Sequence, residues 1–262
     1  MAAGSTAVGG LFDVTGRLAL VTGSSRGLGR TMATGLAEAG ARVVLHGRDT
    51  AALEAVADDL EARTGTRPAS VTFDVTHAAA VADAVGALVE QHGVPDVLVN
   101  NAGVQRRAPI QEFAVEDWDT VISSNLSSAF YVSRQVAPGM VARGSGKIVN
   151  IASVQSRLAR QTIAPYSASK GGLASLTQGM AADLARFGIQ VNAISPGYFA
   201  TDMNAALWQD PTFDGWVKQR TPAQRWGRVE ELVGALLFLS SDASSFVSGQ
   251  NLSVDGGMSA VV

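Results

Sequence analysis

A tyrosine and a lysine stand four residues apart in the segment Tyr166-Ser167-Ala168-Ser169-Lys170. Four-residue spacing places both side chains on one face of a helix, about 5–6 Å apart at Cβ. A free tyrosine has a pKa of about 10, and a nearby ammonium favours the phenolate and lowers that pKa. Two interpretations follow: the pair is an acid/base couple, or it is an ordinary surface or packing pair.

A glycine-rich turn, Thr22-Gly23-Ser24-Ser25-Arg26-Gly27-Leu28-Gly29, follows the apolar run 18–21. Glycine is needed where a backbone turns sharply or approaches a pyrophosphate closely, and a helix that begins there directs free N–H groups at phosphates. Glycines also serve tight turns that bind nothing. The position between a predicted strand and a predicted helix is the context that dinucleotide binding requires, so this turn predicts a nucleotide site.

The second predicted strand ends in His46-Gly47-Arg48-Asp49. NAD sites usually carry a carboxylate here that accepts the ribose hydroxyls, whereas NADP sites replace it with arginine. No acid occupies positions 43–47, and Arg48 and Arg26 can both reach a 2′-phosphate. Asp49 is either a displaced ribose ligand or the N-cap of the next helix. We expect the cap and hence NADP as the cofactor, with NAD possible.

Around these motifs the chain alternates short β-rich runs with longer helical ones. Strands are expected over 18–21, 43–45, 70–75, 96–100, 146–151, 189–194 and 250–254. Helices are expected over 27–39, 50–63, 77–91, 116–142, 164–187 and 230–240. The pattern predicts an α/β fold, with one seven-stranded parallel sheet covered by helices on both faces in a single Rossmann-type doubly wound domain. The domain would span 13–262 after a flexible leader, 1–12, with an irregular substrate-covering region near 197–227.

Composition and charge exclude several classes of protein. With 20 Lys and Arg against 23 Asp and Glu, the net charge is −3, so no global basic field attracts nucleic acid or anionic lipid. The absence of cysteine excludes disulfides, thiolate nucleophiles and cysteine-ligated zinc. No apolar stretch approaches the roughly 20 residues of a membrane helix, and no signal peptide opens the chain. We expect a cytoplasmic protein with a small-molecule substrate and no metal, nucleic-acid or membrane partner.

Further motifs accompany the turn and the Tyr/Lys pair: Asn100-Asn101-Ala102-Gly103, Asn125, Ser153 and Pro196-Gly197. In this order, over 16–257, the set resembles the short-chain dehydrogenase/reductase family. The resemblance implies an NAD(P)-dependent oxidoreductase that assembles as a homotetramer. Helices near 116–142 and 164–187 would form one interface, and the last helix and strand another. The second interface would use Leu232, Leu236, Phe238, Val247 and residues 258–262.

The resemblance also implies a role for each matching residue. Tyr166 would be the general acid/base, and Lys170 would lower its pKa and bind the nicotinamide ribose. Ser153 would hydrogen-bond the substrate oxygen, and Asn125 would hold a water of the proton relay. Cofactor contacts would come from Gly23, Ser25, Arg26, Gly27, Leu28, Gly29, Arg48, Asp74, Val75, Asn101, Ala102, Gly103, Tyr166, Lys170, Pro196, Gly197 and Thr201.

Four stretches, 101–107, 153–156, 196–199 and 220–227, are similar to the sugar-acid branch of this family, the gluconate 5-dehydrogenases. That similarity implies interconversion of D-gluconate and 5-dehydro-D-gluconate. A sugar acid brings a carboxylate and hydroxyls, which call for arginine and amide groups. The candidate substrate residues are Arg106, Arg107, Gln155, Arg157 and Tyr198.

Each of these arginines is equally well explained as a side chain that faces solvent or a partner subunit. Two other functions also remain open. The same fold reduces other carbonyls, such as a 3-oxoacyl thioester or another polyol or sugar. The third hypothesis is a nucleotide-binding protein without catalytic activity. The presence of Asn125, Ser153, Tyr166 and Lys170 argues against it, because a protein that only binds a nucleotide needs no acid/base pair.

Overall fold

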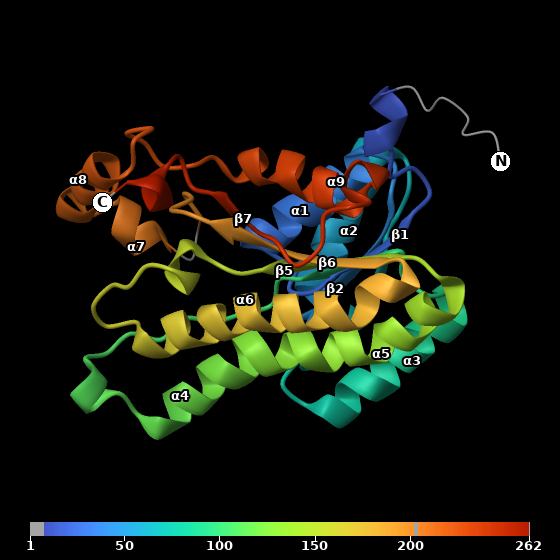
Figure 1. Ribbon diagram of the computed structural model, residues 1–262, viewed down its shortest axis with the longest axis horizontal. Helices are drawn as coiled ribbons and strands as arrows, with labels where there is room; N and C mark the ends of the chain where they lie inside the picture. Colours follow the sequence, from blue (N-terminus) through green and yellow to red (C-terminus); the bar gives the residue numbers. More distant parts are fainter. Residues whose placement is uncertain (1–7, 202–203, 262) are drawn as a thin grey trace.

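The computed structural model describes residues 8–201 and 204–261, so residues 1–7 of the expected leader and Val262 of the expected interface lie outside it. In the described part of the chain, seven parallel strands form one sheet in the order β3-β2-β1-β4-β5-β6-β7 (Figure 1). They are β1 (Leu18–Val21), β2 (Arg42–Gly47), β3 (Ala69–Thr72), β4 (Val97–Asn100), β5 (Gly146–Ile151), β6 (Ile189–Pro196) and β7 (Asn251–Val254). This confirms the predicted fold class.

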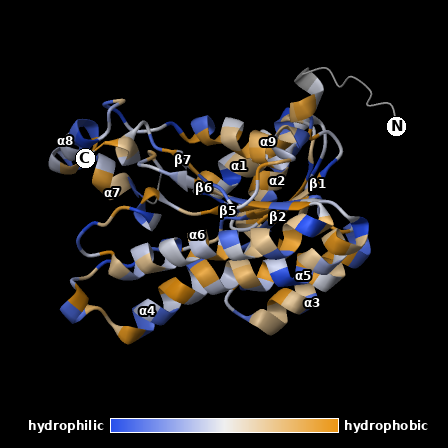
Figure 2. Ribbon diagram, in the orientation of Figure 1, coloured by the Kyte–Doolittle hydropathy of each residue, from blue (hydrophilic) through white to orange (hydrophobic). Residues whose placement is uncertain are grey.

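Helices cover both faces of the sheet (Figure 1). One face packs against α1 (Gly27–Glu38), α2 (Thr50–Thr64) and α9 (Val233–Ser240). The other packs against α3 (Ala78–His92), α5 (Ser128–Arg143) and α6 (Ala164–Leu184), with α4 (Val115–Ile122) beside α6. Every residue of β1, β4 and β5 is buried, which explains why these strands are largely apolar; the buried polar exceptions are Asn100, Lys147 and Asn150. The helices carry both orange and blue residues, as expected for helices with one buried face (Figure 2).

The strand order places β1 next to β4, so the chain winds outward in opposite directions from this pair. In open α/β sheets, ligands bind outside the carboxyl ends of the strands at such a reversal. The glycine-rich turn follows β1, and the Asn-Asn-Ala-Gly segment follows β4. The topology therefore brings the sequence motifs to one edge of the sheet.

Several element boundaries differ from the expectation. The third strand ends at Thr72 rather than at 75, because Asp74 accepts the backbone N–H of Thr76 at 2.9 Å and turns the chain. The expected helix 116–142 is interrupted by a π-helix, Ser123–Ser127. The expected irregular region contains α7 (Ala205–Trp208) and α8 (Pro211–Arg220).

The end of the expected flexible leader has a structure of its own. Residues Val8–Phe12 form a 3-10 helix, and the Phe12 ring lies 6.4 Å from that of Phe238 between centroids. The described part of the leader therefore packs on α9 through one aromatic contact.

The expected second interface patch is partly wrong. Leu232, Leu236 and Met258 are buried in the subunit itself. Leu232 and Leu236 belong to the hydrophobic core between the helices and the sheet. Phe238 and Val247 are half-buried.

Among the helices that the structure describes, none combines the length and the apolar character needed to cross a membrane.

Candidate active site

The catalytic candidates meet at the carboxyl edge of the sheet. Ser153 follows β5 and is buried, and Tyr166 lies in the first turn of α6, where both side chains line one cavity. The Ser153 Oγ accepts the backbone N–H of Gln155 at 3.2 Å, which leaves the hydroxyl proton free to donate. Lys170 lies one turn further along α6, with its Nζ 5.8 Å from the centre of the Tyr166 ring.

Burial has opposite effects on the two members of the Tyr/Lys pair. It raises the pKa of Tyr166, and the Ser153 hydroxyl acts in the opposite direction. It lowers the pKa of Lys170 to about 8, while Nζ donates to the Ile151 carbonyl at 2.6 Å. Burial is thus the largest influence on the pKa of Tyr166 in this structure, and it acts upward. That Lys170 lowers this pKa stays a prediction.

Asn125 lies in the π-helix between α4 and α5 and acts through its side-chain amide. Its Oδ1 accepts the N–H of Val104 at 2.7 Å, and its Nδ2 donates to the Val104 carbonyl at 2.9 Å and to Ser169 Oγ at 3.1 Å. These bonds hold the loop after β4 against the start of α6. The role in a proton relay stays a prediction. A π-helix at a functional site is a recurrent arrangement.

The turn after β1 fits a pyrophosphate. Gly23 and Gly27 have φ values of +66° and +55°, a region that side chains other than glycine rarely adopt. A Cβ on Gly29 would overlap the Gly23 carbonyl, so the third glycine lets α1 begin against the turn. No side chain caps the first turn of α1 at Arg26, which leaves its backbone N–H groups available to an anion.

His46 supports this turn from β2, a role that no motif in the sequence indicates. The N–H of Gly23 donates to Nδ1 of His46 at 3.1 Å, and Nε2 lies 3.1 Å from the Phe73 carbonyl. Only the neutral ring with its proton on Nε2 satisfies both contacts. Burial lowers the pKa of His46 to about 4, which favours this neutral form. The sequence signal for this role is a polar histidine that directly follows the apolar run 43–45 of a buried strand.

The end of β2 supports the NADP interpretation. Asp49 accepts the N–H of Ala52 at 3.1 Å and caps α2, which confirms the expected cap. Arg48 is exposed, and its Nη1 lies 3.8 Å from Asp74 Oδ2. Arg26 is exposed on the turn, whereas Val75 is buried.

The segment after β4 is tied to the turn after β1. Asn101 Nδ2 donates to the carbonyls of Thr22 at 2.9 Å and Gly23 at 3.1 Å, and the N–H of Ala102 donates to Thr22 Oγ1 at 3.1 Å. A Cβ on Gly103 would lie 2.9 Å from Asn125 Oδ1, so the glycine allows close approach. The segment therefore has a structural role as well as forming a wall of the proposed cofactor site.

The other expected cofactor residues lie at or near this edge. Pro196 ends β6 and is buried, and the N–H of Gly197 donates to the Val254 carbonyl at 2.9 Å. Ser25 and Leu28 are half-buried in the turn. Thr201 is half-buried beyond β6, and its cofactor role stays a prediction.

The structure separates the substrate candidates into two groups. Arg107, Gln155 and Tyr198 line the cavity that holds Ser153 and Tyr166. Arg106 instead pairs with Asp117 at 3.2 Å, and Arg157 is exposed. The last two are therefore better explained as surface side chains.

Arg160, which is not among the residues predicted from the sequence, also lines the cavity. Its Cζ lies 5.1 Å from the centre of the Phe213 ring, and its buried Nε has no hydrogen-bond partner among the described residues. Burial and the charge of Arg160 lower the pKa of Arg107. No sequence motif marks Arg160, because its contact with Phe213 joins segments far apart in the chain.

Comparison with known proteins identifies the family. The family model described as Enoyl-(Acyl carrier protein) reductase matches residues 23–259. The chain belongs to the short-chain dehydrogenase/reductase family. It is 54% identical to the gluconate 5-dehydrogenase of Gluconobacter oxydans over 95% of this chain and 96% of that one. It is 47% identical to the 5-keto-D-gluconate 5-reductase of Escherichia coli K12 over 95% of this chain and 97% of that one.

A solved relative has the same overall structure. The crystal structure of a gluconate 5-dehydrogenase from Burkholderia cenocepacia J2315 in complex with NADP and tartrate matches with a TM-score of 0.94. The sequence identity is 50%, and the match covers 97% of this short-chain dehydrogenase/reductase and 99% of the relative. The expected family and Rossmann-type fold are thereby confirmed.

Proposed function

We propose that this chain is an NADP-dependent oxidoreductase that interconverts D-gluconate and 5-dehydro-D-gluconate. One observation carries the proposal: two arginines, Arg107 and Arg160, line the cavity of the acid/base tyrosine. Neither forms an ion pair with a carboxylate among the residues that the structure describes. Two neighbouring guanidinium groups without a counter-charge favour a ligand that brings a carboxylate.

The polar side of the cavity supports the same substrate class. Gln155 is buried, and its Oε1 has no partner within the described part of the chain, so a substrate hydroxyl would satisfy it. Tyr198 packs edge-on against the rings of Phe213, Trp216 and Trp226, each at 5.6–5.7 Å between centroids. This cluster connects the cavity wall to α8. The relatives named for gluconate and 5-keto-D-gluconate support the assignment.

The residues of the chain suit the chemistry at C5 of gluconate. In oxidation, Tyr166 as phenolate accepts the proton of the C5 hydroxyl, and in reduction the phenol returns it. The Ser153 Oγ accepts the Gln155 N–H, and its own hydroxyl proton is free to be donated to the reacting oxygen. Lys170 adds positive charge beneath this site and is fixed by the Ile151 carbonyl. Bound NADP supplies the hydride acceptor or donor.

The cofactor would be held by this chain's own turn and strand ends. The uncapped amides at the start of α1 would take the pyrophosphate, and Arg48 and Arg26 would take the 2′-phosphate. The carboxylate of Asp74 lies near Arg48, with Oδ2 3.8 Å from Nη1. It would compete only weakly with the 2′-phosphate for Arg48, because the Arg48–Asp74 ion pair is long and exposed.

A substrate panel with both cofactors tests the proposal. The absorbance of NADPH or NADH would follow the oxidation of gluconate, glucose and sorbitol and the reduction of 5-dehydrogluconate and a 3-oxoacyl thioester. We expect gluconate to exceed the neutral compounds, and NADPH to reduce 5-dehydrogluconate. Activity on the thioester without activity on gluconate would contradict the substrate and leave the acid/base residues as assigned.

The proposal includes a homotetramer in the cytoplasm, where soluble nucleotide cofactors are regenerated. Phe130 on α5 is 47% exposed, which supports the interface expected along α5 and α6. Leu252 on the edge strand β7 is 38% exposed, which supports a second interface through the last strand. Exposed apolar side chains on a sheet edge favour pairing with another subunit.

A further inference from the structure

A second cavity, of about 330 Å³, lies at the amino ends of the strands, at the edge of the sheet opposite the candidate active site. Arg17 and Asp96 stand just before β1 and β4, and Lys147 and Gln190 are the second residues of β5 and β6. Strands β1, β4, β5 and β6 are neighbours in the sheet, so the polar and charged side chains at their amino ends lie close together. The proposed oxidoreductase activity uses none of these residues.

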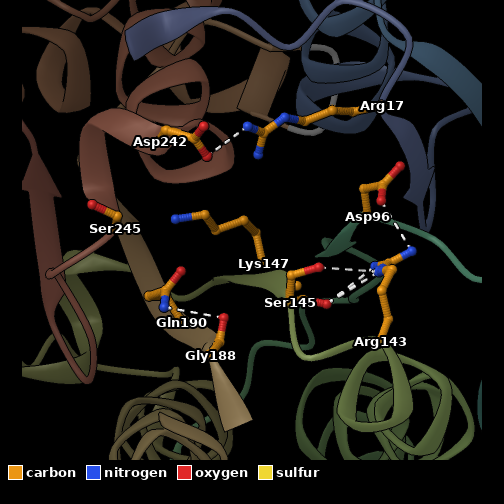
Figure 3. A pocket seen from close by; sticks show the side chains of 10 residues that line it. Arg17, Asp96, Arg143, Ser145, Lys147, Gly188, Gln190, Asp242 and Ser245 are labelled. Carbon is orange, nitrogen blue, oxygen red and sulfur yellow. Dashed lines mark hydrogen bonds and ion pairs between the residues drawn. The ribbon is translucent and has the colours of Figure 1, made fainter. Parts of the chain in front are cut away.

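Lys147 is the central group of this cavity. Its side chain extends into the middle of the cavity, between Arg17 and Asp242 on one side and Gln190 on the other (Figure 3). Lys147 is only 5% exposed, and its Nζ donates to Ser244 Oγ at 3.3 Å. No carboxylate of the described chain pairs with this ammonium, although buried charges are normally paired.

The other charges of the cavity are already partly neutralised. Arg143 lies 3.0 Å from Asp96, and its remaining N–H groups are taken by the carbonyls of Val94 and Pro95 and by Ser145. The hydrogen-bonding capacity of Arg143 is therefore used within the protein, and this side chain has a structural role.

Arg17 keeps donors available to a ligand. Its Nη2 lies 2.6 Å from Asp242, and its Nη1 donates to the Ser240 carbonyl at 3.1 Å. The guanidinium has five N–H groups, so the other three have no protein partner within the described residues. The cavity holds three cations, Arg17, Arg143 and Lys147, and two carboxylates, Asp96 and Asp242. The two arginines pair with the two carboxylates, so one net positive charge remains, on the buried Lys147.

We propose that this cavity binds a small phosphate-type oxyanion between Lys147 and Arg17. A phosphate oxygen would satisfy the two N–H groups that Lys147 does not use on Ser244, and the guanidinium of Arg17 would donate alongside. The cavity is at the lower end of the usual size of small-molecule sites, so it accommodates inorganic phosphate or a small phosphomonoester.

Calorimetric titration of the full chain in chloride buffer tests this site with two probes, inorganic phosphate and glycerol phosphate. We expect Lys147→Met to weaken binding at least tenfold, because the variant keeps the length of the side chain and loses the charge. Lys218→Met is the matched control, since Lys218 pairs with Asp214 on exposed α8. Arg48→Ala should retain this binding, which distinguishes the cavity from the cofactor turn. Tighter binding of glycerol phosphate than of inorganic phosphate would identify a phosphomonoester as the ligand class.

A second measurement needs no variant at Lys147. Acetic anhydride labels accessible amines, and mass spectrometry reports the labelled fraction of each lysine in the wild-type protein. Phosphate should lower the labelling of Lys147 severalfold and leave that of Lys218 unchanged. Equal labelling of Lys147 with and without phosphate would overturn the proposal, as would phosphate binding that Lys147→Met does not alter or that Arg48→Ala abolishes.

Discussion

In the proposed reaction, the phenol of Tyr166 would serve as a base in one direction and as an acid in the other. Burial raises its pKa, so the neutral phenol predominates at pH 7. This favours reduction, in which the phenol donates its proton. Oxidation instead needs the phenolate, which becomes available only as the pH rises towards that pKa.

The two directions should therefore have opposite pH profiles. We expect kcat/KM for gluconate oxidation to rise as the pH increases above 7, and kcat/KM for 5-dehydrogluconate reduction to fall at alkaline pH. Initial rates in both directions across pH 6–11 would measure this.

Tyr166→Phe should retain cofactor binding and lose nearly all turnover, since only the hydroxyl is removed. Parallel profiles in the two directions, or near wild-type kcat in the variant, would exclude this acid/base role.

The arginines of the cavity can be tested one by one. Arg107→Met and Arg160→Met should each raise KM for gluconate by about tenfold to a hundredfold, because a charge-assisted hydrogen bond contributes roughly 1.5–3 kcal/mol. Sorbitol oxidation should change much less, since sorbitol has no carboxylate.

Two further arginines provide matched controls. Arg106→Met and Arg157→Met remove the same group from side chains that are ion-paired or exposed outside the cavity. These controls should leave KM for gluconate within about twofold of the wild type. Equal effects at all four positions would show that net charge, rather than position in the cavity, determines substrate affinity.

At the scale of the elements, the turn between β1 and α1 depends on β2. Gly23 is held by neutral His46, and protonation of Nδ1 would break that hydrogen bond. The pKa of His46 is about 4 in the folded chain, against about 6.5 for an unperturbed histidine. The unfolded state thus binds more protons between these values, so stability is lost as the pH falls from about 6.5 to about 4.

The glutamine variant isolates this contribution. In His46→Gln, the amide can accept from Gly23 and donate to the Phe73 carbonyl without titrating. We expect wild-type unfolding free energy to fall by about 3 kcal/mol more than that of the variant between pH 7 and 4. Denaturant titrations at each pH would measure the difference. His77→Gln removes an exposed histidine and should keep the wild-type slope; if it shows the same reduced slope as His46→Gln, the turn is not the cause.

Local patterns predicted the strands and the glycine turn because apolar runs and glycine positions are themselves local. The interrupted helix at 123–127 was missed because its cause is distant: Asn125 binds the backbone of Val104, on the loop after β4. Asp210 caps α8 through the N–H of Thr212 at 2.9 Å, with Pro211 following. This local signal marks the start of a helix within the region expected to be irregular. Arg160 could not have been selected, since only the folded chain brings it over Phe213.

For the whole molecule, the two edges of the sheet differ in what they present. The carboxyl edge gathers the proposed acid/base residues, the proposed cofactor turn and two arginines that form no ion pair with a carboxylate in the described part of the chain. The amino edge gathers the buried Lys147 and the Arg17/Asp242 pair. Because the strands are parallel, the two sets lie a full strand length apart, and a ligand at the amino edge would not compete with the substrate for space.

Assembly can be tested on the exposed face of α5. Phe130 is 47% exposed on the helix expected at one interface of the tetramer, and burying a phenylalanine ring contributes roughly 1.5–3 kcal/mol. Phe130→Arg would place a charge there in every subunit, facing the same patch of its partner at a two-fold interface. We expect the wild type to elute as a tetramer at micromolar concentration and Phe130→Arg as a dimer held by the other interface. Ile110→Arg, which alters a side chain 70% exposed outside α5 and α6, should remain tetrameric. Light scattering coupled to size-exclusion chromatography gives the masses, and a stable wild-type monomer would contradict the assembly.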